Sequence, residues 1–195
     1  MRMKNGQLKP AYNIQFAVNS EYMVWVSLVH QLTNTTALIP FLKFIDDYTK
    51  FKYPKIIADA GYEVEENYTF LERNDQLSFI KPTNYEISKT RIYKTDIGHI
   101  DNIDYNEAND YYICKNSKKL FAHKIINRKS KTGYKSEITC HTFKEYHNSQ
   151  YKSSCLKKNN SKIPLENKTR NLQVSKLFHE KRKLKYNYEP RGMSA

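Results

Sequence analysis

The residue best placed to do chemistry is Asp59, which directly follows the apolar run Ile56-Ile57-Ala58. Such a run predicts a β-strand covered on both faces, and in open α/β sheets ligands gather at the carboxyl ends of the strands. The neighbours Ala60 and Gly61 are small and leave room for a metal ion or a phosphate. An Asp after a buried strand also commonly caps a following helix, here the stretch beginning at Tyr62, and the pattern alone favours that structural role.

Apolar periodicity predicts the elements that position Asp59. We predict strands at 12–19, 23–29, 56–58 and 77–80 and helices at 38–48 and 64–71. The first strand alternates apolar and polar side chains, as expected of a half-buried strand. Thr35 and Thr36 are candidate N-caps for the first helix. The predicted order is therefore β-β-α-β-α-β.

Two stretches in this part of the chain carry distinctive motifs. One contains Ala11-Tyr12-Asn13-Ile14-Gln15, and the other is Ile57-Ala58-Asp59-Ala60-Gly61-Tyr62. The first resembles a Gly-Tyr-Asn-x-Gln motif, with Ala in place of Gly, and the second resembles the second-aspartate motif of the DDE transposases of bacterial insertion sequences. Residues 38–42 and 79–82 are similar to the stretches that flank these motifs, and the resemblance is best over residues 3–86.

The resemblance implies a ribonuclease-H-like fold and a reaction that cuts and rejoins DNA. Members of this family hold two divalent ions, Mg²⁺ or Mn²⁺, with two Asp and one Glu, and the ions stabilise the attacking and leaving oxygens at phosphorus. Asp59 corresponds to the second Asp and is the one catalytic and metal-binding residue that the resemblance assigns here. The first Asp would precede Met1 and the Glu would follow Ala195, so we expect a fragment that is inactive alone.

Other acidic residues do not fill these roles. Asp46 and Asp47 belong to a predicted helix that also carries Lys43, and Glu180 precedes Lys181-Arg182-Lys183. These acids fit solvated charges and local ion pairs better than metal ligands.

Charge is unevenly distributed along the chain. Residues 1–110 carry 12 Lys and Arg against 15 Asp and Glu, whereas residues 111–195 carry 21 against 5. This asymmetry indicates a nearly neutral folded part joined to a segment suited to a polyanion, most plausibly nucleic acid. A gene rich in A and T would also encode many Lys and Asn residues, and both interpretations stay open.

The cysteines and histidines of the second half contain enough ligands for zinc but lack compact spacing. Cys140, His141, His147 and Cys155, with the more distant Cys114 or His123, include no Cys-x-x-Cys pair. A degraded metal site is the favoured interpretation.

The predicted fold class is α/β. We expect a partial ribonuclease-H-like mixed sheet with flanking helices over residues 1–86. An irregular basic, cysteine-containing insertion over 87–171, a basic helix over 172–187 and a disordered tail over 188–195 should follow. No apolar run has the length of a membrane span or the position of a signal peptide, which predicts a cytoplasmic protein.

The leading hypothesis is thus a fragment of a DDE transposase whose partner is DNA, and which could also associate with itself or with an intact transposase. Two alternatives are a non-catalytic nucleic-acid-binding fragment that uses only the basic half, and an unstable pseudogene product.

Overall fold

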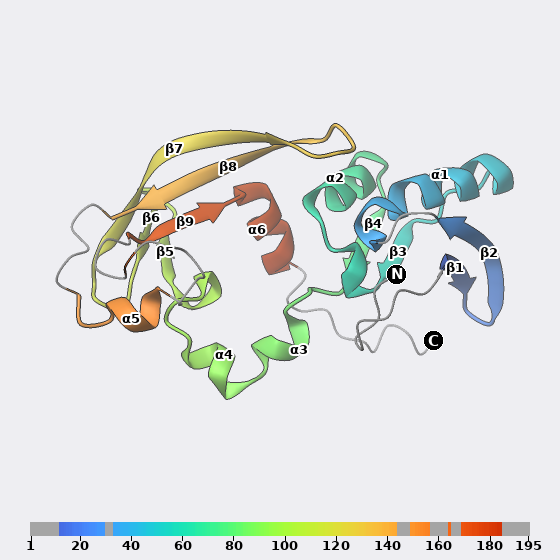
Figure 1. The fold of residues 1–195 in the computed structure, drawn as a ribbon. Coiled ribbons are helices and arrows are strands. Elements are labelled where there is room, and N and C mark those ends of the chain that lie inside the picture. Colours follow the sequence, from blue (N-terminus) through green and yellow to red (C-terminus); the bar gives the residue numbers. More distant parts are fainter. Residues whose placement is uncertain (1–11, 30–32, 144–148, 157–163, 165–168, 185–195) are drawn as a thin grey trace. The chain divides into compact units, whose positions relative to one another are not determined.

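The described part of the chain forms two units. The computed structural model describes residues 12–29, 33–143, 149–156, 164 and 169–184 (Figure 1). Unit 1 comprises the described residues up to Thr83 together with 181–184, and unit 2 comprises those from Asn84 to Glu180. Helices and strands occur in both units, which confirms the predicted α/β class.

Unit 1 has the order β-β-α-β-α-β that the apolar periodicity predicted. Its strands are β1 (Asn13–Asn19), β2 (Tyr22–Val29), β3 (Lys55–Ala58) and β4 (Leu77–Ile80), and its helices are α1 (Leu38–Thr49) and α2 (Glu65–Arg73). Two short 3-10 turns are η1 (Asn34–Thr36) and η2 (Ala60–Tyr62). β1 and β2 pair antiparallel, and β3 and β4 pair parallel. Among the described strands these remain two separate sheets, where we predicted one mixed sheet.

The β1–β2 hairpin buries a polar side chain and exposes its apolar side. Gln15 is 3% exposed, whereas Phe16 is 56% exposed and its cross-strand partner Val26 is 53% exposed. A half-buried strand is normally covered on its apolar side, and here the opposite side is covered. The cause is that the Gln15 amide finds hydrogen-bond partners within unit 1, which alternation alone cannot reveal.

Helix α1 buries the apolar stripe that its sequence spacing predicted, consisting of Leu38, Phe41, Leu42 and Ile45. The prediction of its N-cap is wrong, because Ala37 holds that position and no side chain caps the helix. Thr35 and Thr36 lie in η1, so the chain makes a 3-10 turn before the α-helix begins. The helix ends at Lys50 in the left-handed conformation, a common helix terminator.

Helix α2 packs on the β3–β4 pair. Tyr68 and Leu71 of α2 and Ile80 of β4 are almost fully buried, and the Tyr68 hydroxyl donates to the Ile80 carbonyl at 3.5 Å. Ile57 of β3 is 50% exposed. The prediction that this strand is covered on both faces is therefore wrong, since one side of the two-stranded sheet stays open.

Unit 2 is built on an antiparallel sheet with the strand order β5-β6-β7-β8-β9. Its strands are β5 (Asp104–Asn106), β6 (Tyr111–Ile113), β7 (Lys119–Lys129), β8 (Lys135–Thr142) and β9 (Asn171–Val174). Its helical segments are α3 (Tyr85–Ser88), α4 (Arg91–Thr95), η3 (Ile100–Asn102) and α5 (Lys152–Cys155). Irregular structure was predicted over 87–171, and this is wrong for most of the described residues.

Strand β7 is hard to recognise in the sequence because most of its side chains are exposed. Of its 11 residues, Leu120 is buried and Ile126 half-buried. Where a strand pair extends beyond the core, neither of its faces is buried. Apolar and polar side chains then need not alternate, so periodicity does not reveal the strand. The hairpin turn contains Gly133 at φ +91°, a conformation that favours glycine.

The predicted basic helix over 172–187 begins later than expected. Leu172 and Val174 belong to β9 and pack in the core of unit 2 with Ile103, Tyr112 and Leu120. Their spacing of two residues places both on one face of a strand. The helix itself, α6, spans Lys176–Leu184. Residues 185–187 and the tail predicted over 188–195 lie outside the described residues.

None of the helices in the described ranges combines the length and apolarity that a membrane crossing requires.

Candidate functional site

Asp59 lies at the carboxyl end of β3, where the sequence placed it. It is exposed and serves as N-cap of η2, its Oδ1 accepting a hydrogen bond from the Ala60 amide at 2.7 Å. Asp59 thus has a capping role, but it caps the 3-10 turn Ala60–Tyr62 and not a helix that begins at Tyr62, and α2 begins at Glu65 without a side-chain cap. The cap occupies one carboxylate oxygen, and in the described residues the other oxygen has no hydrogen-bond partner.

A network of neutral amides lies between β1 and the turn after Asp59. The Tyr62 hydroxyl donates to the Gln15 side-chain oxygen. The Gln15 amide in turn donates to Asn13 Oδ1 at 2.6 Å and to Asn34 Oδ1 at 3.3 Å, and Asn13 Nδ2 donates to Asn34 Oδ1 at 2.9 Å. The network thus joins β1, η1 and η2 through side chains that carry no charge.

Two further residues fix the η2 turn beside this network. Asn67 of α2 is fully buried and donates to the backbone oxygens of Tyr62 at 2.8 Å and Thr35 at 3.2 Å. Gly61 approaches Asn34 so closely that a Cβ there would lie 3.1 Å from Asn34 Nδ2. The absence of a side chain at Gly61 therefore allows η1 and η2 to meet.

The electrostatics of this site are set by Asp59. Burial, together with the negative charge of Asp59, raises the pKa of the Tyr62 hydroxyl above its ordinary value. Tyr62 consequently stays a protonated donor toward Gln15 at neutral pH. The site offers one carboxylate at the surface and oriented amides behind it, which suits an oxygen-ligand cation such as Mg²⁺ or Mn²⁺ at a single coordination position.

The residues present do not complete a two-metal centre. Across the part of the chain that the structure describes, no three His, Cys, Asp or Glu side chains converge on a metal-sized space. Asp59 fits one ligand position, and Asp46 and Asp47 lie on α1 rather than on the η2 turn.

Sequence reasoning missed Glu63, a buried carboxylate that follows η2. It is 7% exposed, and its Oε2 accepts from the backbone amide of Thr83 at 2.6 Å and from the Thr83 hydroxyl at 2.7 Å. These bonds fasten the η2 turn to the segment after β4. The available signal was the apolar–acidic alternation around Glu63, which does not separate a buried acid from an exposed one.

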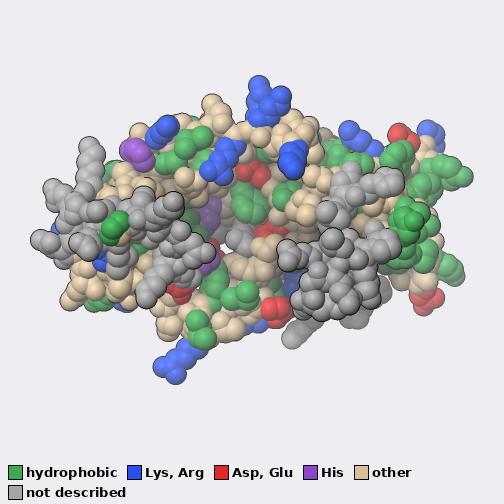
Figure 2. Space-filling view, in the orientation of Figure 1, with side chains coloured by type: hydrophobic (Ala, Val, Ile, Leu, Met, Phe, Trp, Pro, Cys, Tyr) green, Lys and Arg blue, Asp and Glu red, His purple; other side chains and the backbone are tan. Residues whose placement is uncertain are grey.

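A strongly basic surface occupies the long hairpin of unit 2. We define the basic ribbon as residues 118–142, which form β7, β8 and their connections. Its cations are Lys118, Lys119, Lys124, Arg128, Lys129, Lys131 and Lys135, all exposed, against the single acid Glu137. Several Lys and Arg side chains are visible along the edge of the view in Figure 2 that β7 and β8 occupy in Figure 1. The positive charge of this ribbon is thus concentrated on exposed side chains.

No family model, curated protein or solved structure matches this chain. The assignment of Asp59 therefore rests on its motif and on the contacts described above.

An acid of unit 2, Asp110, joins groups from distant parts of the sheet. It accepts hydrogen bonds from Tyr105 at 2.8 Å, from the buried His141 at 3.2 Å and from Lys176 at 2.8 Å. Burial by itself raises the pKa of Asp110, but the hydrogen bonds from Lys176, Tyr105 and His141 outweigh it and lower the pKa to about 2. Burial and the charge of Asp110 also raise the pKa of Tyr112 to about 12.

The cysteines do not gather around a metal in the described residues. Cys140 and Cys155 are buried, Cys114 is half-buried, and all three are free thiols. The contact between His123 and Cys140 is a hydrogen bond of 2.9 Å to the Cys140 carbonyl oxygen and does not involve the thiol. His147, the remaining candidate ligand, lies outside the described residues.

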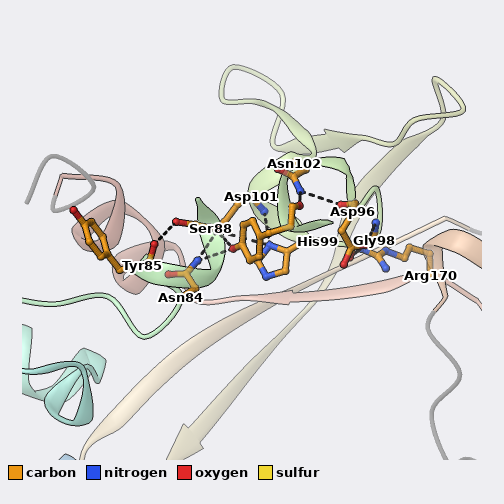
Figure 3. A network of polar contacts seen from close by, with 10 residues as sticks. Asn84, Tyr85, Ser88, Asp96, Gly98, His99, Asp101, Asn102 and Arg170 are labelled. Atoms are coloured by element: carbon orange, nitrogen blue, oxygen red, sulfur yellow. Dashed lines mark hydrogen bonds and ion pairs between the residues drawn. The ribbon is translucent and has the colours of Figure 1, made fainter. Parts of the chain in front are cut away.

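A second polar network ties the short helices of unit 2 to its sheet (Figure 3). The Arg170 guanidinium, next to β9, donates to the carbonyl oxygens of Gly98 and Cys155, each at 2.6 Å. The Asp101 carboxylate accepts from the hydroxyl of Tyr93. These groups are engaged with one another, so we interpret this network as structural.

Proposed function

We propose that this chain is a piece of a DDE-type DNA transposase, in which Asp59 is a metal-binding carboxylate and the basic ribbon contacts DNA. The observation that chiefly supports the proposal is the hydrogen bond between Gln15 and Tyr62. These two residues belong to the two separate stretches that resemble the family's motifs. Their contact beside Asp59 is what a shared functional site would require of them.

The local structure gives each motif residue a physical role in this proposal. Gln15 and Asn13 orient the phenol of Tyr62, Gly61 allows η1 to approach, and Asp59 presents a carboxylate to solvent. We expect the chain by itself to bind DNA without cutting it. Two-metal catalysis needs carboxylates from three positions, and the resemblance assigns one of them to this chain.

A titration with Mn²⁺ followed by NMR tests the role of Asp59. Because the ion is paramagnetic, even weak binding should broaden the amide signals of Ala60, Gly61 and Tyr62 selectively. The Asp59→Asn variant should lose this broadening, since it keeps a capping oxygen but not the charge. Asp47→Asn, an exposed acid on α1, is the matched control and should keep it. Broadening that is absent from the η2 turn, or unchanged in Asp59→Asn, contradicts the proposal.

A second candidate function is a nucleic-acid-binding module without a metal role. It is favoured by the basic ribbon, whose seven cations face one acid. Salt-sensitive duplex binding that depends on the ribbon, combined with no Mn²⁺ effect at Asp59, would support this candidate over the first.

A further inference from the structure

At the start of β7, within the basic ribbon, unit 2 contains a groove whose aromatic and imidazole side chains have no role in the proposed function. Its volume is about 660 Å³, and it is lined by Ser117, Lys118, Lys119, Phe121, Ala122, His123, Thr142 and Phe143. This size lies in the range of small-molecule sites, roughly 300–1,000 Å³. The lining combines two cations, two aromatic rings, two hydroxyls and one imidazole, so it is suited to a ligand with both a planar and an anionic part.

The two lysines of the groove are held over aromatic rings instead of against acids. Lys119 Nζ lies 4.6 Å from the centre of the Tyr111 ring, and Lys118 Nζ lies 5.8 Å from that of Phe143. Among the described residues, neither lysine forms an ion pair with a carboxylate. Successive side chains of a strand point to opposite faces, so Lys119 shares the face of Tyr111 and Phe121, whereas Lys118 lies on the side of Phe143. Lys119 is therefore the cation next to Phe121 that a phosphate group could meet.

Phe121 supplies an aromatic surface beside this cation. It is 53% exposed although it lies in the sheet, where it pairs with Thr142 of β8. Its ring centre is 5.5 Å from that of Tyr111, so the ring is supported from one side. A planar nucleobase can stack on such a ring, and stacking of this kind accepts every base.

A bulge in β7 brings an imidazole to the same place. The register against β8 shifts between Ala122 and Lys124, which makes His123 an extra residue in the strand. Its Nδ1 donates to the Cys140 carbonyl at 2.9 Å, since a carbonyl can only accept. The bond fixes the ring and leaves Nε2 for a ligand. Bulges re-aim side chains in this way at functional positions.

We propose that this groove binds one nucleotide unit, with its base on Phe121 and its phosphate at Lys119. The ligand is either a free nucleoside monophosphate or one residue of a single-stranded nucleic acid, because both present the same base and phosphate. The proposal goes beyond duplex binding by the ribbon and does not depend on Asp59.

Isothermal titration of the full chain with adenosine 5′-monophosphate tests the inference. Saturable binding is expected, with adenosine and inorganic phosphate each binding more weakly. Phe121→Ala should weaken binding by about tenfold, as expected for the loss of one stacked base. Ile125→Ala, which truncates an equally exposed apolar side chain of β7 outside the groove, should leave it unchanged. Lack of saturation at millimolar nucleotide, or an equal loss in both variants, overturns the proposal.

The phosphate part is tested by a matched pair of charge changes. Lys118→Gln with Lys119→Gln should reduce nucleotide affinity, whereas Lys129→Gln with Lys131→Gln, at the far end of the hairpin, should not. An equal loss of nucleotide affinity in both double variants would show general charge attraction and would contradict a phosphate site in the groove. A single-stranded deoxyadenosine oligomer distinguishes the two ligands. If it binds more tightly than the monophosphate and loses affinity in Phe121→Ala, the ligand is a single-stranded nucleic acid. If the two affinities are equal, the ligand is the free nucleotide.

The same variants separate this inference from the proposed function. Phe121→Ala should retain duplex binding, because the ring is not needed for contacts to backbone phosphates. If the unmodified chain binds the nucleotide but not the duplex, the proposed role of the ribbon is wrong and the groove proposal is unaffected. If the unmodified chain binds the duplex but not the nucleotide, only the groove proposal is wrong.

Discussion

The two units use polar side chains in opposite ways. In unit 1, the amides of Asn13, Gln15 and Asn34 form hydrogen bonds with one another. In unit 2, the seven cations of the basic ribbon are exposed, and the ribbon contains one acid. Mutually satisfied groups fix a geometry, whereas unsatisfied charges create a field that reaches a partner. The amide network of unit 1 therefore fixes a local geometry, whereas the cations of unit 2 produce a positively charged surface.

The acids of the two units show the same contrast. Asp59 uses one oxygen as a local cap and offers the other to solvent. In contrast, both carboxylate oxygens of Asp110 accept hydrogen bonds, which come from Tyr105, His141 and Lys176. One acid is available to a ligand, and the other holds its own unit together.

The largest expected effect concerns the field of unit 2. Replacing Lys124, Lys129, Lys131 and Lys135 by Gln should weaken duplex binding on the order of a hundredfold, because fewer phosphate contacts release fewer counterions. The slope of log affinity against log salt should fall by about 0.9 for each lysine that contacts a phosphate. Fluorescence anisotropy over a range of salt concentrations measures both.

The matched control for this experiment removes four cations from unit 1. Lys43, Lys50, Lys52 and Lys55 are also exposed, and their replacement by Gln should leave affinity and slope nearly unchanged. Equal losses in the two variants would show that net charge matters and that the ribbon has no special role.

The next effect concerns the Arg170 bonds. Arg170→Met removes two charge-assisted hydrogen bonds to backbone carbonyls and should destabilise unit 2 by about 2 kcal/mol. Hydrogen exchange resolved by peptide should rise in unit 2, while the fluorescence of Trp25, the sole tryptophan, should report unit 1 unchanged. Arg128→Met is the control, since Arg128 makes one hydrogen bond, to Gln173, on an exposed strand. If both variants lose the same stability, the assigned role of Arg170 is wrong.

A smaller effect tests the inverted hairpin of unit 1. Gln15→Leu should cost about 1 kcal/mol, because Tyr62, Asn13 and Asn34 lose a partner in a half-buried place. Phe16→Thr should change stability by less than about 0.5 kcal/mol, since Phe16 is mostly exposed. Urea unfolding followed by Trp25 fluorescence compares the two. A larger cost for Phe16→Thr would mean that the apolar side of the hairpin is the buried one.

The smallest effect concerns pH and Asp110. The folded-state pKa is about 2, below the ordinary value, so Asp110 contributes stability above about pH 4 that is lost as the pH falls toward 2. Asp110→Asn should flatten this part of the profile, and Asn tolerates the φ of 49° at this position. The side chain is 35% exposed, so solvent should limit the effect to less than about 1 kcal/mol. Asp104→Asn, an exposed acid of β5, should leave the profile unchanged.

The sequence by itself determined the order of elements in unit 1 and the place of Asp59. Local signals were sufficient here, because each helix has an apolar stripe and the run 56–58 ends abruptly at a polar residue. These features depend on neighbours within a few positions in the chain.

Tertiary structure decided the rest. That Gln15 turns inward and Phe16 outward depends on Tyr62 and Asn34, which lie far away in sequence. Strand β9 of unit 2 likewise joins β8 from far along the chain, and β7 is too exposed to leave a periodic pattern. A side chain is buried where distant partners satisfy it, and local periodicity contains no information about those partners.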